Sequence, residues 1–440
     1  MRNMHGELAQ LPSNLAPEVR AYDPEVYQAL ETEIVAAQEA GIEVSVASLP
    51  RDGAYTGEKL QAVNGRLDRL QRAYEDEAAY TRRRRWGGAV LERAGVMLPR
   101  QLRGPVKRLQ QELNEQRRQM LYAPIDAEPW FQQCGRAAAL ATITSAPELL
   151  TEGESGGGYD TMGGPLAEAA LHLPFTAPGN AQDATALDMA QAVSQRSPEK
   201  TAQHLRATHE FLEAPITDGF RDIVQYCWDG IGIRERKEAV NQLITEQLRQ
   251  RATERPVKDM VMMSVGCGTA LPVMEAMARI KQETNQAPQL ILLDQDPIAL
   301  KLAEELAAQY QLEDVIEIQC RQLFDTRGRL LDVHEVLQGR QLDIVEDSGL
   351  REYLPDAVYR DLTRDAYAAL RPGGLMVTSN MNAHRPQKAF LHGLMGWPIP
   401  VQHRTIQEGV VLHQAAGIPT SSMQAQVVPS GVYTVFASVK

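Results

Sequence analysis

Cysteine is scarce in this sequence, and the few that are present form no pattern. The 440 residues include four cysteines, Cys134, Cys227, Cys267 and Cys320, which are far apart and include no CxxC pair. Such spacing excludes a disulfide framework and a structural zinc site, because both need closely grouped cysteines. We therefore expect free thiols, no bound metal and a cytoplasmic protein.

Long apolar runs and positive charge are also lacking. No stretch approaches the roughly 18 consecutive apolar residues of a membrane span, and residues 1–7 hold no apolar signal core. The formal net charge of -12 argues against a protein that mainly coats nucleic acid. With 440 residues, 43% of them hydrophobic, the chain can form two or three domains around a sizeable core. We expect no membrane span.

Helices dominate the pattern of the first half. Asp23 and Pro24 suit an N-cap and a first helical position, and Gly41 suits a helix end, which predicts a helix over 24–40. Alternation at 42–46 predicts a short strand, and apolar spacing from 56 to 74 predicts a second amphipathic helix. We expect a mainly helical region at 1–150, a glycine- and proline-rich linker or lid at 151–196, and a helical cap at 197–256.

A basic segment interrupts this region. Residues 82–118 contain eleven Lys or Arg residues and three acidic residues. Two interpretations stay open: a docking surface for RNA or an anionic membrane, and a solvated helix face that packs on the acidic remainder. The second interpretation is favoured.

From residue 257 the pattern changes to alternating strands and helices. Apolar or alternating runs predict strands at 261–265, 289–293, 315–318, 342–345, 375–378, 423–428 and 432–439, with helices between most of them. This alternation predicts an α/β fold with a doubly wound parallel sheet of seven strands. The short connection between the last two strands makes the final strand antiparallel. Ligands of such sheets bind at the carboxyl ends of the strands.

The first two of these strands end in a recognisable pattern. Gly266-Cys267-Gly268 follows the first strand, Asp294 ends the second, and Arg371-Pro372-Gly373-Gly374 precedes the fifth. Together with the terminal hairpin, this arrangement resembles the class I S-adenosylmethionine-dependent methyltransferases over about 215–440. The resemblance implies a Rossmann-like domain at 257–440 and S-adenosyl-L-methionine as the cofactor. A nicotinamide dehydrogenase is disfavoured, because the third glycine of its fingerprint is Leu271 here.

The resemblance also implies which residues hold the cofactor. Glycines allow close backbone approach, and the Asp294 carboxylate suits two ribose hydroxyls. The family often has an acidic residue past the third strand, where this sequence has Arg321, and either Gln322 or a backbone group is the expected substitute. The predicted cofactor residues are Val265, Gly266, Cys267, Gly268, Thr269, Asp294, Gln295, Gln322, Leu323 and Glu346.

Acceptor residues are expected in the loops after the fourth and fifth strands and on the helical cap. His384 is the predicted general base, with the alternative that it only forms structural hydrogen bonds. Asp347 and Tyr353 are expected beside the transferred methyl, with the alternative that Tyr353 only seats the next helix. The predicted substrate-binding residues are Trp228, Arg234, Asn380 and Arg385.

A bacterial group of methyltransferases without a defined substrate is resembled more closely by four stretches, which are 228–230, 349–355, 379–386 and 395–398. The expected function is methyl transfer from S-adenosylmethionine to a hydroxyl, carboxylate or amine of a small molecule. The alternatives are an RNA methyltransferase that docks through 82–118, and a binding module that keeps the fold without catalysis. A homo-oligomer is compatible with the sequence.

Overall fold

The computed structural model describes residues 15–49, 55, 58–69, 72, 222, 225–295, 297–324, 330–388 and 401–440. Most of the N-terminal half, including the basic segment 82–118 and the glycine cluster at 152–165, lies outside the described residues. The predictions made for those segments, and the domain boundaries at 150 and 196, therefore stay predictions.

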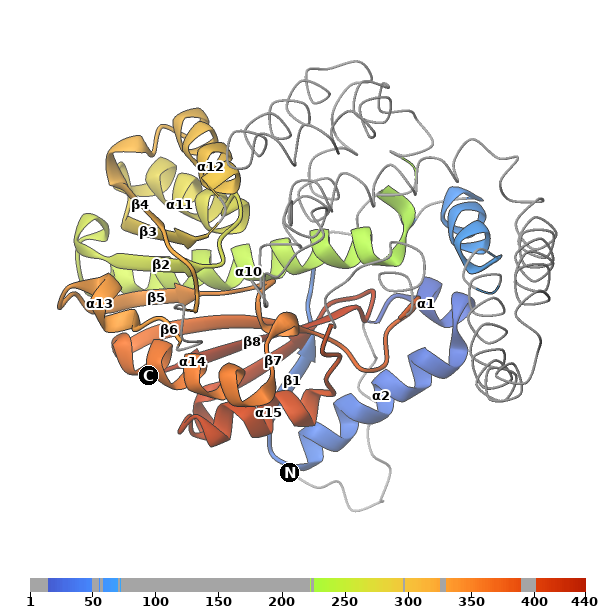
Figure 1. The fold of residues 1–440 in the computed structure, drawn as a ribbon. Coiled ribbons are helices and arrows are strands. Elements are labelled where there is room, and N and C mark those ends of the chain that lie inside the picture. The colour runs from blue at the N-terminus through green and yellow to red at the C-terminus, as the bar shows by residue number, and fades with distance from the viewer. Residues whose placement is uncertain are drawn as a thin grey trace, which may run out of the picture.

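A single mixed sheet forms the centre of the described structure (Figure 1). Its eight strands are β1 (Glu43–Val46), β2 (Val261–Val265), β3 (Gln289–Asp294), β4 (Ile316–Cys320), β5 (Leu342–Glu346), β6 (Leu370–Met381), β7 (Met423–Val427) and β8 (Tyr433–Val439). Their order across the sheet is β1-β7-β8-β6-β5-β2-β3-β4. The predicted Rossmann-like methyltransferase architecture is confirmed.

Strand directions follow the predicted scheme. Strands β4, β3, β2, β5 and β6 pair in parallel, and β8 runs antiparallel to both β6 and β7. Residues of β2 and β5 are buried along their whole length, as expected for the middle of a parallel sheet covered on both faces. The antiparallel final strand is thus confirmed.

The predicted count of seven strands is wrong by one. The additional strand is β1, which pairs in parallel with β7, from Glu43 beside Gln424 to Val46 beside Val427. Alternation had indicated a strand at this place, but a local pattern does not reveal the partner of a strand. The N-terminal segment thus extends the same sheet as the C-terminal hairpin.

Helices cover both faces of the sheet (Figure 1). Helices α10 (Trp228–Ala252), α11 (Leu271–Thr284) and α12 (Pro297–Gln309) pack on one another in sequence. The opposite layer contains α13 (Val333–Leu337), α14 (Asp356–Ala369), α15 (Ile406–Ala415) and α2 (Pro24–Glu39), with α1 (Pro17–Tyr22) against α2. Residues 58–69 are helical as predicted. Single 3-10 turns occur at Val257–Asp259, Glu313–Val315, Arg351–Tyr353 and Thr420–Ser422.

Helix α10 lies unusually close to the sheet. All residues from 228 to 235 are buried, and the Cys227 thiol caps the helix by accepting a hydrogen bond from Gly230 N at 3.3 Å. A Cβ atom at Gly232 would lie 2.5 Å from Cβ of Val432, so only glycine permits this approach. The first two turns of α10 are therefore part of the core.

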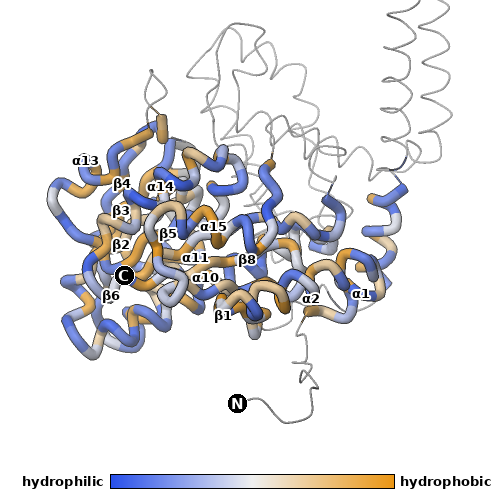
Figure 2. The backbone as a smooth tube through the Cα atoms, turned by 90° about the horizontal axis from the view of Figure 1, so that it is seen from below, coloured by the Kyte–Doolittle hydropathy of each residue, from blue (hydrophilic) through white to orange (hydrophobic). Residues whose placement is uncertain are grey.

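Apolar side chains form one continuous core between these layers. Figure 2 shows apolar stretches along the central strands β2 and β3 and hydrophilic stretches on outer turns. Among the helices that the structure describes, none combines the length and the apolar character that crossing a membrane requires.

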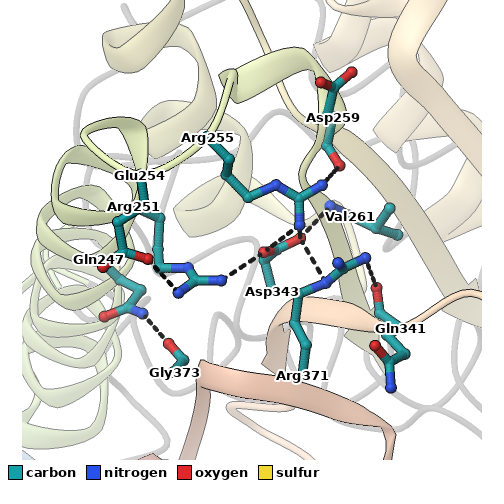
Figure 3. Close-up of polar contacts among 10 residues, drawn as sticks. All are labelled: Gln247, Arg251, Glu254, Arg255, Asp259, Val261, Gln341, Asp343, Arg371 and Gly373. Atoms are coloured by element: carbon teal, nitrogen blue, oxygen red, sulfur yellow. Dashed lines mark hydrogen bonds and ion pairs between the residues drawn. The ribbon is translucent and has the colours of Figure 1, made fainter.

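One buried carboxylate ties α10 to the amino ends of the strands (Figure 3). Asp343 in β5 has no exposed side-chain surface, and its Oδ2 accepts a hydrogen bond from Val261 N at 2.9 Å. Arg255 Nη1 lies 3.1 Å and Arg251 Nη2 3.5 Å from Oδ1, and Arg371 Nε lies 3.5 Å from Oδ2. A single side chain thus joins α10, β2, β5 and β6.

We predict that Asp343→Asn strongly destabilises the protein. Removing one partner from a buried charge cluster leaves the others uncompensated, which costs about 3–5 kcal/mol. Urea denaturation should show a loss of this order. The matched control is Glu254→Gln, because Glu254 is 52% exposed and pairs with the same Arg251 at 2.6 Å. The control should cost less than about 1 kcal/mol, and equal losses for the two variants would contradict the prediction.

A second buried polar group, His413 of α15, responds to pH. Its Nδ1 donates a hydrogen bond to Gly409 O at 2.8 Å, and its Nε2 lies 3.2 Å from Thr378 Oγ1. Burial lowers the pKa of His413 to about 4. The folded protein therefore favours the neutral ring, while an unfolded chain takes up the proton near the ordinary pKa of about 6.5.

Acidification should therefore remove stability through His413. The contribution is fully present above about pH 6.5 and is lost as the pH falls towards 4, up to about 3 kcal/mol. Urea denaturation of the wild type and His413→Gln at several pH values measures it. The difference in free energy of unfolding between the two proteins should shrink from pH 7.5 to pH 4, and a constant difference would contradict this prediction.

Candidate functional site

The glycine loop after β2 has the backbone that the sequence predicts. Gly266 has φ 62° and Gly268 has φ 52°, values that disfavour other residue types. Ala270, with φ 56°, adopts the same left-handed conformation and forms the N-cap of α11. Three left-handed residues within five positions mark a sharply turned connection from β2 into α11.

Strand β3 anchors this loop. The N–H groups of Gly266 and Cys267 both donate to Leu293 O, at 2.8 and 3.3 Å. Asp294, the next residue, is only 4% exposed, and its Oδ2 accepts a hydrogen bond from Gly268 N at 2.9 Å. The two sequence motifs, Gly-Cys-Gly and Asp294, are therefore in direct contact.

The end of β4 adjoins the same place. Cys320 pairs in register with Asp294, and Arg321 N donates to Asp294 O at 2.9 Å. Gln295 is half-buried, and its carbonyl oxygen lies 3.6 Å from Cys320 Sγ. Gln322 is exposed and Leu323 is half-buried. Both follow β4 directly, which keeps them near the predicted cofactor position.

Glu346 ends the neighbouring strand β5. Its Oε2 accepts a hydrogen bond from Ser264 Oγ at 2.6 Å, and its Oε1 accepts one from Ser348 N at 2.6 Å. Burial raises the pKa of Glu346, and these hydrogen bonds oppose the shift. This carboxylate therefore ties β2, the glycine-loop strand, to the loop after β5.

Asp347, predicted beside the methyl, is engaged on both oxygens. Arg351 Nε donates to its Oδ1 at 2.9 Å, and Arg351 Nη2 contacts its Oδ2. Both side chains are buried, and Arg351 Nη1 also donates to Tyr359 O and Thr363 Oγ1. These contacts favour a structural role for Asp347.

His384, the predicted base, lies beside the N-terminal segment. Its Nε2 is 3.2 Å from Oε1 of Glu33 in α2, and its side chain is 47% exposed. The pairing fastens α2 to the loop that follows β6, and the role of His384 as a base stays a prediction.

The four predicted substrate residues have different surroundings. Arg385 is fully buried, and its Nη2 lies 2.5 Å from Oδ2 of Asp229 in the first turn of α10. Asn380 accepts a hydrogen bond from Arg404 Nη1 at 2.9 Å. Arg234 donates to the carbonyl oxygen of Gln225. Only Arg385 forms an ion pair that joins the loop after β6 to the predicted cap.

Trp228 is fully buried between residues of the N-terminal segment. Its ring lies 5.4 Å from the Tyr22 ring and 6.2 Å from the Tyr55 ring, measured between centroids. Gln387 Oε1 is 3.4 Å from Trp228 N, and Gln387 Nε2 donates to Asn64 Oδ1 at 2.8 Å. Gln387 therefore connects its own loop to Trp228 and to Asn64, two distant parts of the chain.

The sequence did not predict a group of residues at the carboxyl end of the sheet. Arg236 Nη1 is 3.1 Å from Glu352 Oε1, and the Arg236 guanidinium lies 4.5 Å from the centre of the Tyr433 ring. Burial raises the pKa of Tyr353 well above its ordinary value, and the neighbouring Glu352 adds to the shift. Tyr353 therefore stays protonated and can donate a hydrogen bond, but it does not act as a base.

The N-terminal segment contributes a second missed group. Tyr55 Oη donates to Glu235 Oε1 at 2.5 Å, and Ser430 N donates to Glu235 Oε2 at 2.9 Å. A lone tyrosine far upstream carries no sequence signal for this contact. The one sign of this contact is that Glu235, a charged residue, lies on the buried face of a helix.

With this geometry established, comparison with known proteins is informative. Residues 221–440, half of the chain, match a protein family with the description "Putative methyltransferase". The chain belongs to this family. The match begins just before α10 and covers every strand of the sheet except β1.

Solved structures with related folds are only distantly similar. A Bordetella parapertussis protein with the description "possible exported protein" has 19% identity and a TM-score of 0.43, and the match covers 69% of this chain and 96% of that one. A Burkholderia thailandensis O-methyltransferase family protein has 14% identity and a TM-score of 0.35, with 70% and 95% covered. The CMeT domain of the citrinin polyketide synthase has 11% identity and a TM-score of 0.37, with 71% and 90% covered. No curated protein matches the chain.

Proposed function

We propose that this methyltransferase takes its methyl group from S-adenosyl-L-methionine and transfers it to a hydroxyl, carboxylate or amine of a small molecule. The observation that carries the proposal is the contact between the left-handed glycine loop and the buried Asp294 carboxylate. Family membership supports methyl transfer, and this contact supports the choice of donor.

The residues present suit that cofactor. Gly266 and Gly268 carry no side chain that would hold a ligand away from the backbone, and Asp294 supplies a carboxylate that can accept hydrogen bonds from two ribose hydroxyls. Leu271, buried at the start of α11, occupies the position where a dinucleotide fold needs glycine for tight packing. When bound, the cofactor supplies an activated methyl group on a positively charged sulfur.

The chain itself has to position the acceptor and exclude water. Helix α10, whose first turns are buried, packs on β6 and β8, and the loop of Tyr353 follows the carboxyl end of β5, so both limit the access of water at this edge of the sheet. Tyr353, held in its protonated form by burial, can orient an acceptor through its hydroxyl. We further propose a cytoplasmic location, in keeping with the dispersed cysteines.

The decisive measurement is titration calorimetry of the full chain with S-adenosylmethionine. We expect binding by the wild type and a loss of about 1.5–3 kcal/mol for Asp294→Ala, the scale of hydrogen bonds to a charged group. The matched control is Asp314→Ala, because Asp314 is an exposed aspartate just before β4. The control should bind as the wild type does.

Thermal unfolding of both variants separates lost binding from lost folding, since Asp294 also accepts the Gly268 hydrogen bond. A folded wild-type protein that gives no binding heat would refute the proposed cofactor.

A further inference from the structure

Two buried ion pairs stand at the carboxyl end of the sheet. One joins Asp229 of α10 to Arg385, with side chains 3% and 0% exposed. The other joins Glu352, 2% exposed, to Arg236 of α10, 11% exposed. Two carboxylates are thus held near the place where the acceptor has to meet the cofactor.

Each pair leaves a buried carboxylate oxygen without a hydrogen bond. Among the residues that the structure describes, none donates a hydrogen bond to Asp229 Oδ1 or to Glu352 Oε2. A buried acceptor without a donor costs about 1–3 kcal/mol, and such atoms in folded proteins need an explanation. A donor group that arrives with a ligand would remove this cost.

Asp229 and Glu352 share two tyrosine neighbours. Tyr353 and Tyr433 both lie within electrostatic range of Asp229 and of Glu352. Arg236, which pairs with Glu352 and covers the Tyr433 ring, is also within range of Glu346 at the end of β5. The loop that carries Glu352 also lies against the glycine loop, because a Cβ atom on Gly266 would lie 3.4 Å from the Leu350 side chain.

We infer that the methyl acceptor enters with a proton on its nucleophilic atom, as an amine or a hydroxyl, that this group donates a hydrogen bond to Glu352, and to Asp229 as well where the group is an amine with a second proton, and that carboxylate acceptors are excluded. The inference rests on the proposed function and narrows its acceptor class.

Charge explains the exclusion. Arg236 and Arg385 are already paired with Glu352 and Asp229, so neither arginine is free to neutralise an incoming carboxylate. An incoming carboxylate would add negative charge and would bring no proton for the vacant oxygens. An amine or hydroxyl supplies the missing donor.

The transfer step balances with these groups. A lone pair on the acceptor nitrogen or oxygen forms the new bond to the methyl carbon. The electrons of the broken carbon–sulfur bond stay on sulfur. The proton of the acceptor passes to Glu352 or Asp229 and then to water. Burial raises the pKa of Glu352, which improves it as a proton acceptor.

The chemistry of the labelled product tests the inference. The full chain is incubated with methyl-tritiated S-adenosylmethionine and the low-molecular-weight fraction of cells of the source organism. The products are then treated with mild alkali, which releases methanol from methyl esters but leaves N-methyl and ether bonds intact. We expect label that stays non-volatile. Retention on a cation exchanger at acid pH then separates amine products from hydroxyl products.

Volatile tritiated methanol as the main product would overturn the inference, because it identifies a carboxylate acceptor. Absence of any labelled product from a protein that binds the cofactor would also overturn it. Failure of the cofactor to bind in calorimetry is a different result, since it refutes the proposed function itself.

Glu352→Gln provides the second test. In this variant, the amide NH2 group is a hydrogen-bond donor and faces the donor group of the methyl acceptor. Formation of the alkali-stable product should therefore slow roughly tenfold or more. The dissociation constant for S-adenosylmethionine should change less than about twofold. The control is Glu317→Gln on β4, which alters a 42% exposed carboxylate that also pairs with an arginine, Arg340, at 2.7 Å. Equal rates for the two variants would overturn the assignment of Glu352.

Discussion

Buried ion pairs at both ends of α10 fix this helix against the sheet. Arg251 and Arg255 near its C-terminus meet Asp343, and Asp229 and Arg236 in its first turns meet Arg385 and Glu352. A buried charge without its partner is costly, so the register of the helix is strongly constrained. A slide by one turn, about 5.4 Å, would break the pairs at both ends together. The 25-residue helix is therefore fixed at two places, with its C-terminus at the amino edge of the sheet and its first turns at the carboxyl edge, where the site lies.

The N-terminal segment depends on the same helix and sheet. Strand β1 pairs with β7, Glu33 accepts a hydrogen bond from Ile406 N at 3.2 Å, and Tyr55 meets Glu235 of α10. Within the described residues, the segment before position 70 and the C-terminal hairpin pack as one unit, although the family match starts only at residue 221. Aromatic residues from this segment enclose Trp228, so the surroundings of the site are built partly by residues outside the family match.

Local patterns in the sequence were sufficient for the central strands, the glycine loop and Asp294. Apolar runs and positive φ are properties of a few adjacent residues, so they can be read from sequence. The contact of Gly268 with Asp294 follows from the pairing of β2 with β3. The contacts around Trp228 could not be read in this way, because Gln387 and Asn64 are 323 positions apart. For the same reason the eighth strand and the pair of Arg385 with Asp229 depend on the complete fold.

Three acidic residues lie near the end of β5, and the sequence alone does not distinguish their roles. Their hydrogen bonds do. Glu346 has both oxygens occupied by Ser264 and Ser348, and Asp347 has both occupied by Arg351. Among the side chains that the structure describes, only Arg236 donates a hydrogen bond to Glu352, at Oε1, although Glu352 is buried as deeply as the others. Saturated carboxylates hold the loop in shape and have little capacity for a further donor. Of the three acids, Glu352 is therefore the one with capacity to accept a hydrogen bond from a ligand.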